Sequence, residues 1–166
     1  ILNNIQNYSF EVLFVNDGSK DNTLDIIRKL REKDSRISYI DFSRNFGKEI
    51  AMMAGMDYAK GDAIIFMDAD LQDPPELIPE LVKYWEQGYD DVYARRKSRQ
   101  GETFLKKITS KAYYKILQKL TKVEIQQDTG DFRLLDKRCV NALKKMRESQ
   151  RNSKSMFSWI GYKKKE

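Results

Sequence analysis

Histidine is absent from this 166-residue chain, and Cys139 is its single cysteine. These absences exclude a Ser-His-Asp or Cys-His nucleophile, histidine-ligated zinc or haem, and a disulfide within the chain. A catalytic metal would have to be held by carboxylate, amide and water oxygens, which favours magnesium or manganese. One free cysteine is typical of a reducing compartment.

Long apolar runs are also absent. The densest apolar stretch, residues 63–67, is far too short to cross a bilayer, and there is no secretory leader pattern. Hydrophobic residues make up 40% of the chain and charged residues 34%, which is typical of one soluble globular domain of this length.

The net charge of +6 conceals an uneven distribution along the chain. Through Asp90 there are 10 Lys and Arg against 17 Asp and Glu, whereas from Asp91 onward there are 21 against 8. The acidic half could hold a cation, and the basic half could meet an anion or an anionic surface. A nucleic-acid-binding protein would explain only the basic half, so we expect no nucleic-acid partner.

Short apolar segments alternate with helical patterns along the chain. The first predicted helix has an apolar face of Leu24, Ile26, Ile27 and Leu30. Alternation of strands and helices predicts a parallel sheet with right-handed crossovers, which binds ligands at the carboxyl ends of its strands. The predicted strands are 11–15, 38–42, 63–67, 91–94 and 132–135, and helices are predicted at about 22–30, 50–58, 77–88, 103–121 and after 136.

Two groups of acids follow predicted strands. Asp68 and Asp70 are two residues apart after the third strand, so on an extended chain both carboxylates can face one cation, and Gln72 could add an amide oxygen. Asp17 follows the first strand, beside Gly18, which permits close approach of a ligand. The alternative interpretations are a turn with solvated acids and an Asx-turn that closes a strand.

The basic half contains two further candidate segments. The run 95–99 has three arginines whose guanidinium groups could bind a phosphate, or it is a solvated basic loop. Asp128, Asp131 and Arg133 surround a glycine and could orient an acceptor and bind its charge, or they form an ordinary turn. The helix at 103–121 is basic and amphipathic, which suits either an acidic membrane surface or packing on the sheet.

The order and spacing of these motifs resemble the family-2 glycosyltransferases that act on polyprenyl phosphates, such as bactoprenol glucosyltransferases and dolichyl-phosphate mannose synthases. The resemblance runs from about residue 10 to 162. It rests on V-N-D-G-S-K-D-N-T at 15–23, R-N-F-G-K at 44–48, D-A-D-L-Q-D-P-P-E at 68–76, R-K-S-R-Q-G-E at 96–102 and D-T-G-D-F-R-L at 128–134.

This resemblance implies an α/β fold of the GT-A type, a nucleotide-sugar-binding sheet with helices on both faces. It implies a single catalytic domain over residues 1–166, without the family's first strand and without its C-terminal membrane region. A missing strand would leave a sheet edge open to pairing, so we expect a tendency to form homo-oligomers.

The resemblance also assigns roles to individual residues. Asp17, Gly47, Lys48 and Asp68 would contact the nucleotide-sugar. Asp70 and Gln72, with Asp68, would hold Mg²⁺ or Mn²⁺ on its diphosphate. Arg96, Arg99 and Arg133 would bind the acceptor phosphate, and Asp131 and Asp128 would be the acceptor-side acids.

The implied reaction is a metal-dependent, inverting transfer of a hexose from a nucleotide-sugar to undecaprenyl or dolichyl phosphate, at the cytoplasmic face of a membrane. One alternative is a family-2 enzyme that acts on a polysaccharide or another cell-envelope acceptor. Another is a magnesium-binding receiver-like signalling module, although Asn16 interrupts the acidic pair such a module needs. A sugar nucleotidyltransferase would need a glycine-rich nucleotide loop, which is not visible here.

Overall fold

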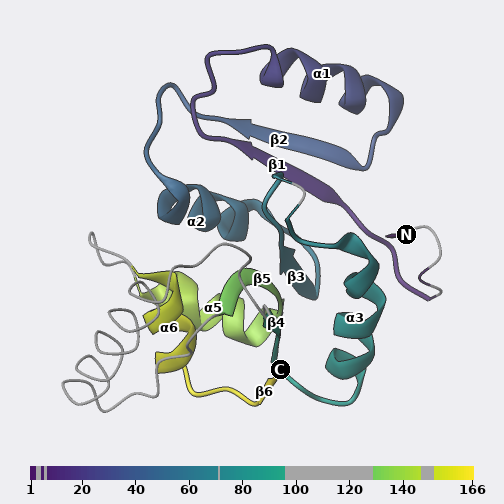
Figure 1. Ribbon diagram of the computed structural model, residues 1–166, viewed down its shortest axis with the longest axis vertical. Helices are drawn as coiled ribbons and strands as arrows, with labels where there is room; N and C mark the ends of the chain where they lie inside the picture. Colours follow the sequence, from purple (N-terminus) through teal and green to yellow (C-terminus); the bar gives the residue numbers. More distant parts are fainter. Residues whose placement is uncertain (3–4, 6, 71, 96–128, 147–151) are drawn as a thin grey trace, which may run out of the picture.

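A computed structural model describes residues 1–2, 5, 7–70, 72–95, 129–146 and 152–166 of the chain (Figure 1). Strands and helices alternate along it as far as Arg95. The strands are β1 (Val12–Asn16), β2 (Ile37–Asp41), β3 (Ala63–Phe66), β4 (Asp91–Arg95), β5 (Thr129–Asp136) and β6 (Lys164–Lys165). The helices are α1 (Thr23–Lys33), α2 (Lys48–Tyr58), α3 (Ile78–Glu86), α5 (Lys137–Lys145) and α6 (Ser153–Trp159), with a 3-10 turn at Pro75–Leu77.

β1 and β2 form a parallel pair, and α1 and α2 lie on opposite sides of it (Figure 1). α1 buries Ile27 but leaves Ile26 and Leu30 exposed by 49% and 39%, so its predicted apolar face is only partly right. A pair of strands covers only a narrow stripe along a helix. Because successive helical residues are about 100° apart, Ile26 lies off the stripe that contains Ile27.

The second sheet has the strand order β3-β5-β4-β6. β5 lies between β3 and β4 and is antiparallel to both, with Leu134 opposite Ile65 on one side and Val92 on the other. The prediction of a wholly parallel sheet is therefore wrong for β5. β3 and β4 do run in the same direction, as predicted. The alternation of strands and helices along the chain does not indicate that a later strand, β5, lies between them.

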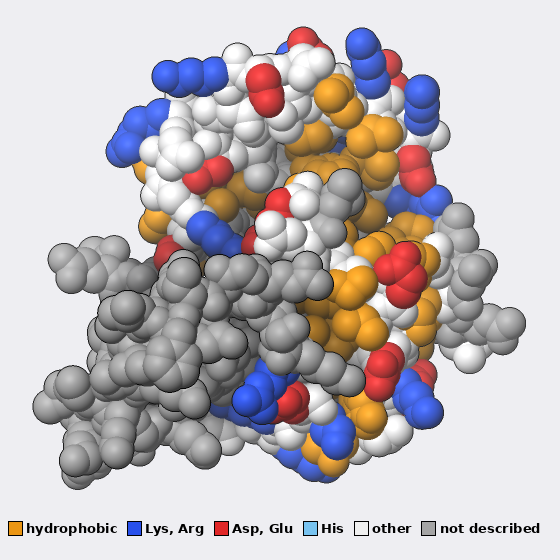
Figure 2. Space-filling model, viewed as in Figure 1, with side chains coloured by type: hydrophobic (Ala, Val, Ile, Leu, Met, Phe, Trp, Pro, Cys, Tyr) orange, Lys and Arg blue, Asp and Glu red, His pale blue; other side chains and the backbone are white. Residues whose placement is uncertain are grey.

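Strands β1 and β3 are edge strands, each paired on one side alone within the described part of the chain. There, β1 pairs only with β2, and β3 only with β5. The apolar side chains of β1 from Val12 to Val15 are half-buried. Hydrophobic side chains also reach the surface over the α1–β2 region and beside α3 (Figure 2). The absence of a first strand stays a prediction.

Two apolar clusters hold the second sheet between its helices. β5 contributes to both of them, because successive strand residues face opposite sides of a sheet. One cluster lies under α5 and α6 and buries Met56, Leu135, Cys139, Val140, Leu143, Met156 and Phe157. The other lies under α3 and buries Ile78, Leu81, Val92, Phe132 and Leu134.

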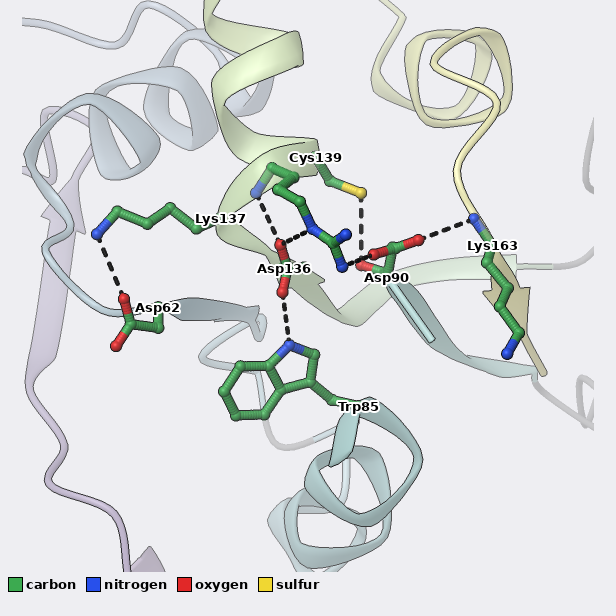
Figure 3. A network of polar contacts seen from close by, with 8 residues as sticks. Asp62, Trp85, Asp90, Asp136, Lys137, Cys139 and Lys163 are labelled. Carbon is green, nitrogen blue, oxygen red and sulfur yellow. Dashed lines mark hydrogen bonds and ion pairs between the residues drawn. The ribbon is translucent and has the colours of Figure 1, made fainter. Parts of the chain in front are cut away.

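A polar network ties α3, β4, β5 and α5 together where β3 and β4 begin (Figure 3). Asp136 caps α5, since its Oδ1 accepts the backbone N–H of Arg138 at 2.8 Å, and its Oδ2 accepts the indole N–H of Trp85 at 2.8 Å. Arg138 also pairs with Asp90, and Lys137 with Asp62. This network lies at the end of the sheet opposite to Asp68, so its role is structural.

No helix among the described residues has both the length and the apolar character to cross a membrane. The predicted helix at 103–121 lies outside those residues.

Candidate active site

The candidate site forms where β1 and β3 end. Asp17 follows β1, and its Oδ1 accepts the backbone N–H of Phe46 at 2.7 Å while its Oδ2 accepts that of Gly47 at 3.0 Å. Asp17 was expected to contact a nucleotide. In the described structure both of its oxygens hold the loop that leads into α2. The contact of Asp17 with a nucleotide stays a prediction.

Two glycines allow these loops to meet. Gly18 has a φ of +70°, and a Cβ on it would lie 2.4 Å from the backbone carbonyl carbon of Arg44. Gly47, at the N-cap of α2, has a φ of +95°. Side chains disfavour this region of backbone space. The backbone of Arg44 and Asn45 thus packs against Gly18. Close approach of a ligand there stays a prediction.

Lys48, the first residue of α2, joins two distant segments of the chain. Its Nζ lies 2.6 Å from Asp68 Oδ2, just beyond β3, and 2.7 Å from Asp131 Oδ2, in β5. One ammonium group thus bridges the acid expected on the donor side and the acid expected on the acceptor side. Asp17 supports this bridge through the backbone of the preceding residue.

The bridge is partly open to solvent. The side chains of Lys48 and Asp68 are 46% and 41% exposed, and that of Asp131 is 16% exposed. Partial burial opposes the charge on Lys48, but hydrogen bonds to Asp131 and Asp68 outweigh it and raise the lysine pKa above its ordinary value. Lys48 therefore stays cationic near neutral pH and partly neutralises the two carboxylates.

The loop after β3 is shaped by its own acids. Asp73, which is 7% exposed, accepts the backbone N–H of Asp68 at 3.2 Å. Asp70 Oδ1 accepts the backbone N–H of Gln72 at 3.0 Å. Asp73 was not among the predicted site residues, although its place in the same acidic motif could have indicated it.

The donor groups in this loop fit a hard divalent cation, because they are carboxylate and amide oxygens on neighbouring residues. In the described structure the positive charge next to Asp68 is the Lys48 ammonium group, 2.6 Å from its Oδ2. No cluster of three or more acidic, histidine or cysteine side chains with metal-binding geometry occurs within the described residues. The convergence of the Asp68 and Asp70 carboxylates and Gln72 on one cation stays a prediction.

Arg133 does not fit its predicted role of binding an acceptor phosphate. Its side chain is fully buried, and its guanidinium donates to both carboxylate oxygens of buried Asp91 at 3.1 and 3.3 Å. The ring of Phe157 lies 3.9 Å from its central carbon. Burial lowers the pKa of Arg133 and raises that of Asp91. An anion cannot reach this group without opening the core.

Three other predicted site residues, Arg96, Arg99 and Asp128, lie outside the described residues. Among the predicted residues, the structure joins Lys48 to Asp68 and Asp131 through ion pairs, and it joins Gly47 to Asp17 through a backbone hydrogen bond. Gly47 adjoins Lys48, and Asp70 and Gln72 lie in the loop that follows Asp68.

Comparison with known proteins settles the family. Residues 1–143 match the model of the family described as glycosyl transferase family 2. The chain belongs to glycosyl transferase family 2.

The family-2 chain is 52% identical over 155 residues to an uncharacterized glycosyltransferase of Synechocystis, covering 93% of the chain and 49% of that protein. It is 43% identical over 159 residues to the prophage bactoprenol glucosyl transferase homolog of Escherichia coli, covering 96% and 52%. It thus spans about half the length of the curated relatives it matches.

A solved structure shares the fold. The mannosyltransferase PcManGT from Pyrobaculum calidifontis, in complex with GDP-Man and Mn²⁺, has a TM-score of 0.62 at 16% identity, over 93% of this chain and 44% of that one. The likeness confirms the α/β fold of the GT-A type that the motifs implied.

Proposed function

We propose that this chain carries the site of a metal-dependent, inverting transfer of a hexose from a nucleotide-sugar to a polyprenyl phosphate. The observation that carries the proposal is the Lys48 bridge, which brings the donor-side acid Asp68 next to the acceptor-side acid Asp131. Membership of family 2 supports the reaction class. Relatives named bactoprenol glucosyl transferase support the acceptor.

On the donor side, Asp68, Asp70 and Gln72 would hold Mg²⁺ or Mn²⁺. Bound there, the ion would neutralise the charge that develops on the leaving nucleotide diphosphate. The Mn²⁺ and GDP-Man of the structural neighbour support a divalent metal that acts with a nucleotide-sugar. Lys48 would add a further positive charge beside Asp68, and the loop held by Asp17 would line the nucleotide.

On the acceptor side, a phosphate oxygen would form the new bond to the anomeric carbon. The bond from that carbon to the nucleotide diphosphate would break on the opposite face, which inverts the configuration. The acceptor phosphate is already anionic near neutral pH, so a chain without histidine suffices. Asp131, with Asp128, would orient the acceptor or take its last proton. Arg96 and Arg99 would bind the phosphate.

The acceptor is a membrane lipid in this proposal, which places the site at the cytoplasmic face of the membrane. The excess of basic residues after Asp91, 21 against 8 acidic, supports contact with an anionic surface.

The test is transfer of radiolabelled sugar into the organic phase, with UDP- and GDP-sugars, polyprenyl phosphates and Mn²⁺. It uses the complete natural polypeptide that contains this sequence. Asp70→Asn is expected to lower metal-dependent transfer by at least about 100-fold, since loss of groups that merely support metal ligands already costs 10- to 100-fold. Asp25→Asn, at an exposed position of α1, is the matched control.

Several outcomes would contradict the proposal. Unchanged turnover in Asp70→Asn would reject the metal assignment. Transfer only to a polysaccharide would replace the acceptor by the alternative that the sequence left open. Retention of configuration in the product would reject the inverting step.

A further inference from the structure

Glu49 and Ser153 meet beside Asp131. The Oε2 of Glu49, in the first turn of α2, accepts the backbone N–H of Ser153 at 3.0 Å, and its Oε1 accepts the Ser153 hydroxyl at 3.1 Å. The same hydroxyl oxygen lies 3.5 Å from Asp131 Oδ1. Ser153 is 7% exposed. The Asp131 carboxylate thus has Lys48 on one oxygen and Ser153 on the other.

The two hydrogen bonds of Ser153 to Glu49 are not equivalent. A serine hydroxyl has one proton, so it donates to either Glu49 or Asp131 at a given moment. The backbone N–H keeps its bond to Glu49 in both cases. The hydroxyl can therefore turn from Glu49 to Asp131 while α6 stays attached to α2.

α6 is held on β5 at two matched points. Ser153 lies against Asp131, and Phe157 lies over Arg133. Four helical residues advance about 6 Å and two strand residues advance about 6.7 Å, so the two spacings nearly coincide. Phe157 is 1% exposed within the apolar cluster under α6. The packing of Phe157 over Arg133 consequently positions the Ser153 hydroxyl next to Asp131.

We propose that Glu49 and Ser153 are positioning residues for the acceptor-side acid: Glu49 holds the start of α6, and the Ser153 hydroxyl orients the Asp131 carboxylate. This inference rests on the proposed function, because Asp131 is its acceptor-side acid. In the described structure, side-chain hydrogen bonds join Glu49 to Ser153 and Ser153 to Asp131, on the acceptor side. Their effect should therefore fall on turnover with the lipid acceptor and not on donor binding.

Ser153→Ala in the complete polypeptide tests this inference. We expect kcat for transfer to polyprenyl phosphate to fall about tenfold, the scale of groups that orient a reacting residue. The KM for the nucleotide-sugar is expected to stay within a factor of about two. Ser153→Thr keeps a hydroxyl and is expected to recover most of the turnover. Glu49→Gln is expected to lower kcat in the same direction and serves if Ser153→Ala does not fold.

Ser158→Ala is the matched control. Ser158 is on the same helix, is 9% exposed, and its hydroxyl has no hydrogen-bond partner within the described residues. Its substitution is expected to leave kcat unchanged. Ser153→Ala added to Asp131→Asn is expected to cause no further loss, because the two act through one carboxylate.

The outcomes separate the two proposals. An active wild type with equal turnover in Ser153→Ala overturns this inference alone. An equal loss in Ser153→Ala and Ser158→Ala also overturns it, since that pattern indicates a structural effect of α6. A wild type that binds nucleotide-sugar but transfers to no polyprenyl phosphate overturns the proposed function, and this inference with it.

Discussion

Lys48, at the start of α2, and Arg133, in β5, are two cationic side chains with different surroundings. The Lys48 side chain is 46% exposed, and its ammonium group contacts Asp68 and Asp131. The side chain of Arg133, two residues along β5 from Asp131, is fully buried and paired with Asp91. The partly exposed charge of Lys48 is available to a ligand, whereas the buried charge of Arg133, paired with Asp91, affects the stability of the fold.

The buried pair leads to a stability prediction. Arg133→Ala is expected to destabilise the fold by about 3–5 kcal/mol, because it leaves the Asp91 carboxylate buried without its counter-ion. Urea unfolding at neutral pH measures this. Arg28→Ala, whose exposed partner is Asp25, is the control and is expected to change stability by at most about 1 kcal/mol. Wild-type stability in Arg133→Ala, combined with a raised KM for the lipid, would restore the phosphate-binding role.

At the scale of elements, the first turn of α2 organises the candidate site. Asp17 holds Gly47, Lys48 contacts the loop after β3 and strand β5, and Glu49 contacts α6. The sequence indicated Asp17, Gly47 and Lys48 through the motifs that contain them. Glu49 and Ser153 were missed because they are 104 residues apart, and neither lies in a local pattern that indicates the other.

The network at the opposite end of the sheet predicts a dependence on pH. Burial raises the pKa of Asp136, but hydrogen bonds from Trp85 and from the backbone and side chain of Arg138 outweigh it, and the pKa lies below its ordinary value. A lowered pKa in the folded state means that this stabilisation is present above about pH 4 and is lost as the pH falls through the folded-state value.

Trp85→Phe removes the indole donor and is expected to bring the Asp136 pKa closer to its ordinary value. The variant is expected to be less stable near neutral pH by about 1.5–3 kcal/mol for the bond to a charged group, and to lose less stability on acidification below about pH 4. Chemical unfolding at a series of pH values measures both. Parallel pH profiles for wild type and variant would show that Asp136 does not link folding to protons.

At the scale of the whole molecule, charge is divided between the two halves of the chain. Asp17, Asp68 and Asp70 belong to the acidic half and surround the donor side of the candidate site. The basic half contains Asp131 and the residues proposed to meet the acceptor. The Lys48 bridge is one of the contacts between the two halves, and it joins Lys48 and Asp68 of the acidic half to Asp131 of the basic half.

This division predicts association with anionic membranes. The complete polypeptide is expected to sediment with vesicles that contain anionic phospholipid at about 0.05 M salt and to be released at about 0.5 M, where screening is within a few ångströms. Vesicles of neutral phosphatidylcholine are the control. Equal binding to neutral vesicles, or binding insensitive to salt, would show that charge does not direct the association.

The amino-acid sequence by itself determined the local features of this protein. Apolar periodicity and turn residues placed β1 to β4 and the early helices, because these signals act within about ten neighbouring residues. The absence of histidine and the spacing of the acids limited the chemistry to oxygen-ligated metals, and the motifs indicated the family.

Only the tertiary structure decided which distant segments meet. It inserted β5 antiparallel between β3 and β4, sealed Arg133 against Asp91, and set Ser153 beside Asp131. The sequence of a motif does not indicate whether its arginine is exposed to solvent or buried in the core. Its surroundings come from packing between segments far apart in the chain, and no local pattern records that packing.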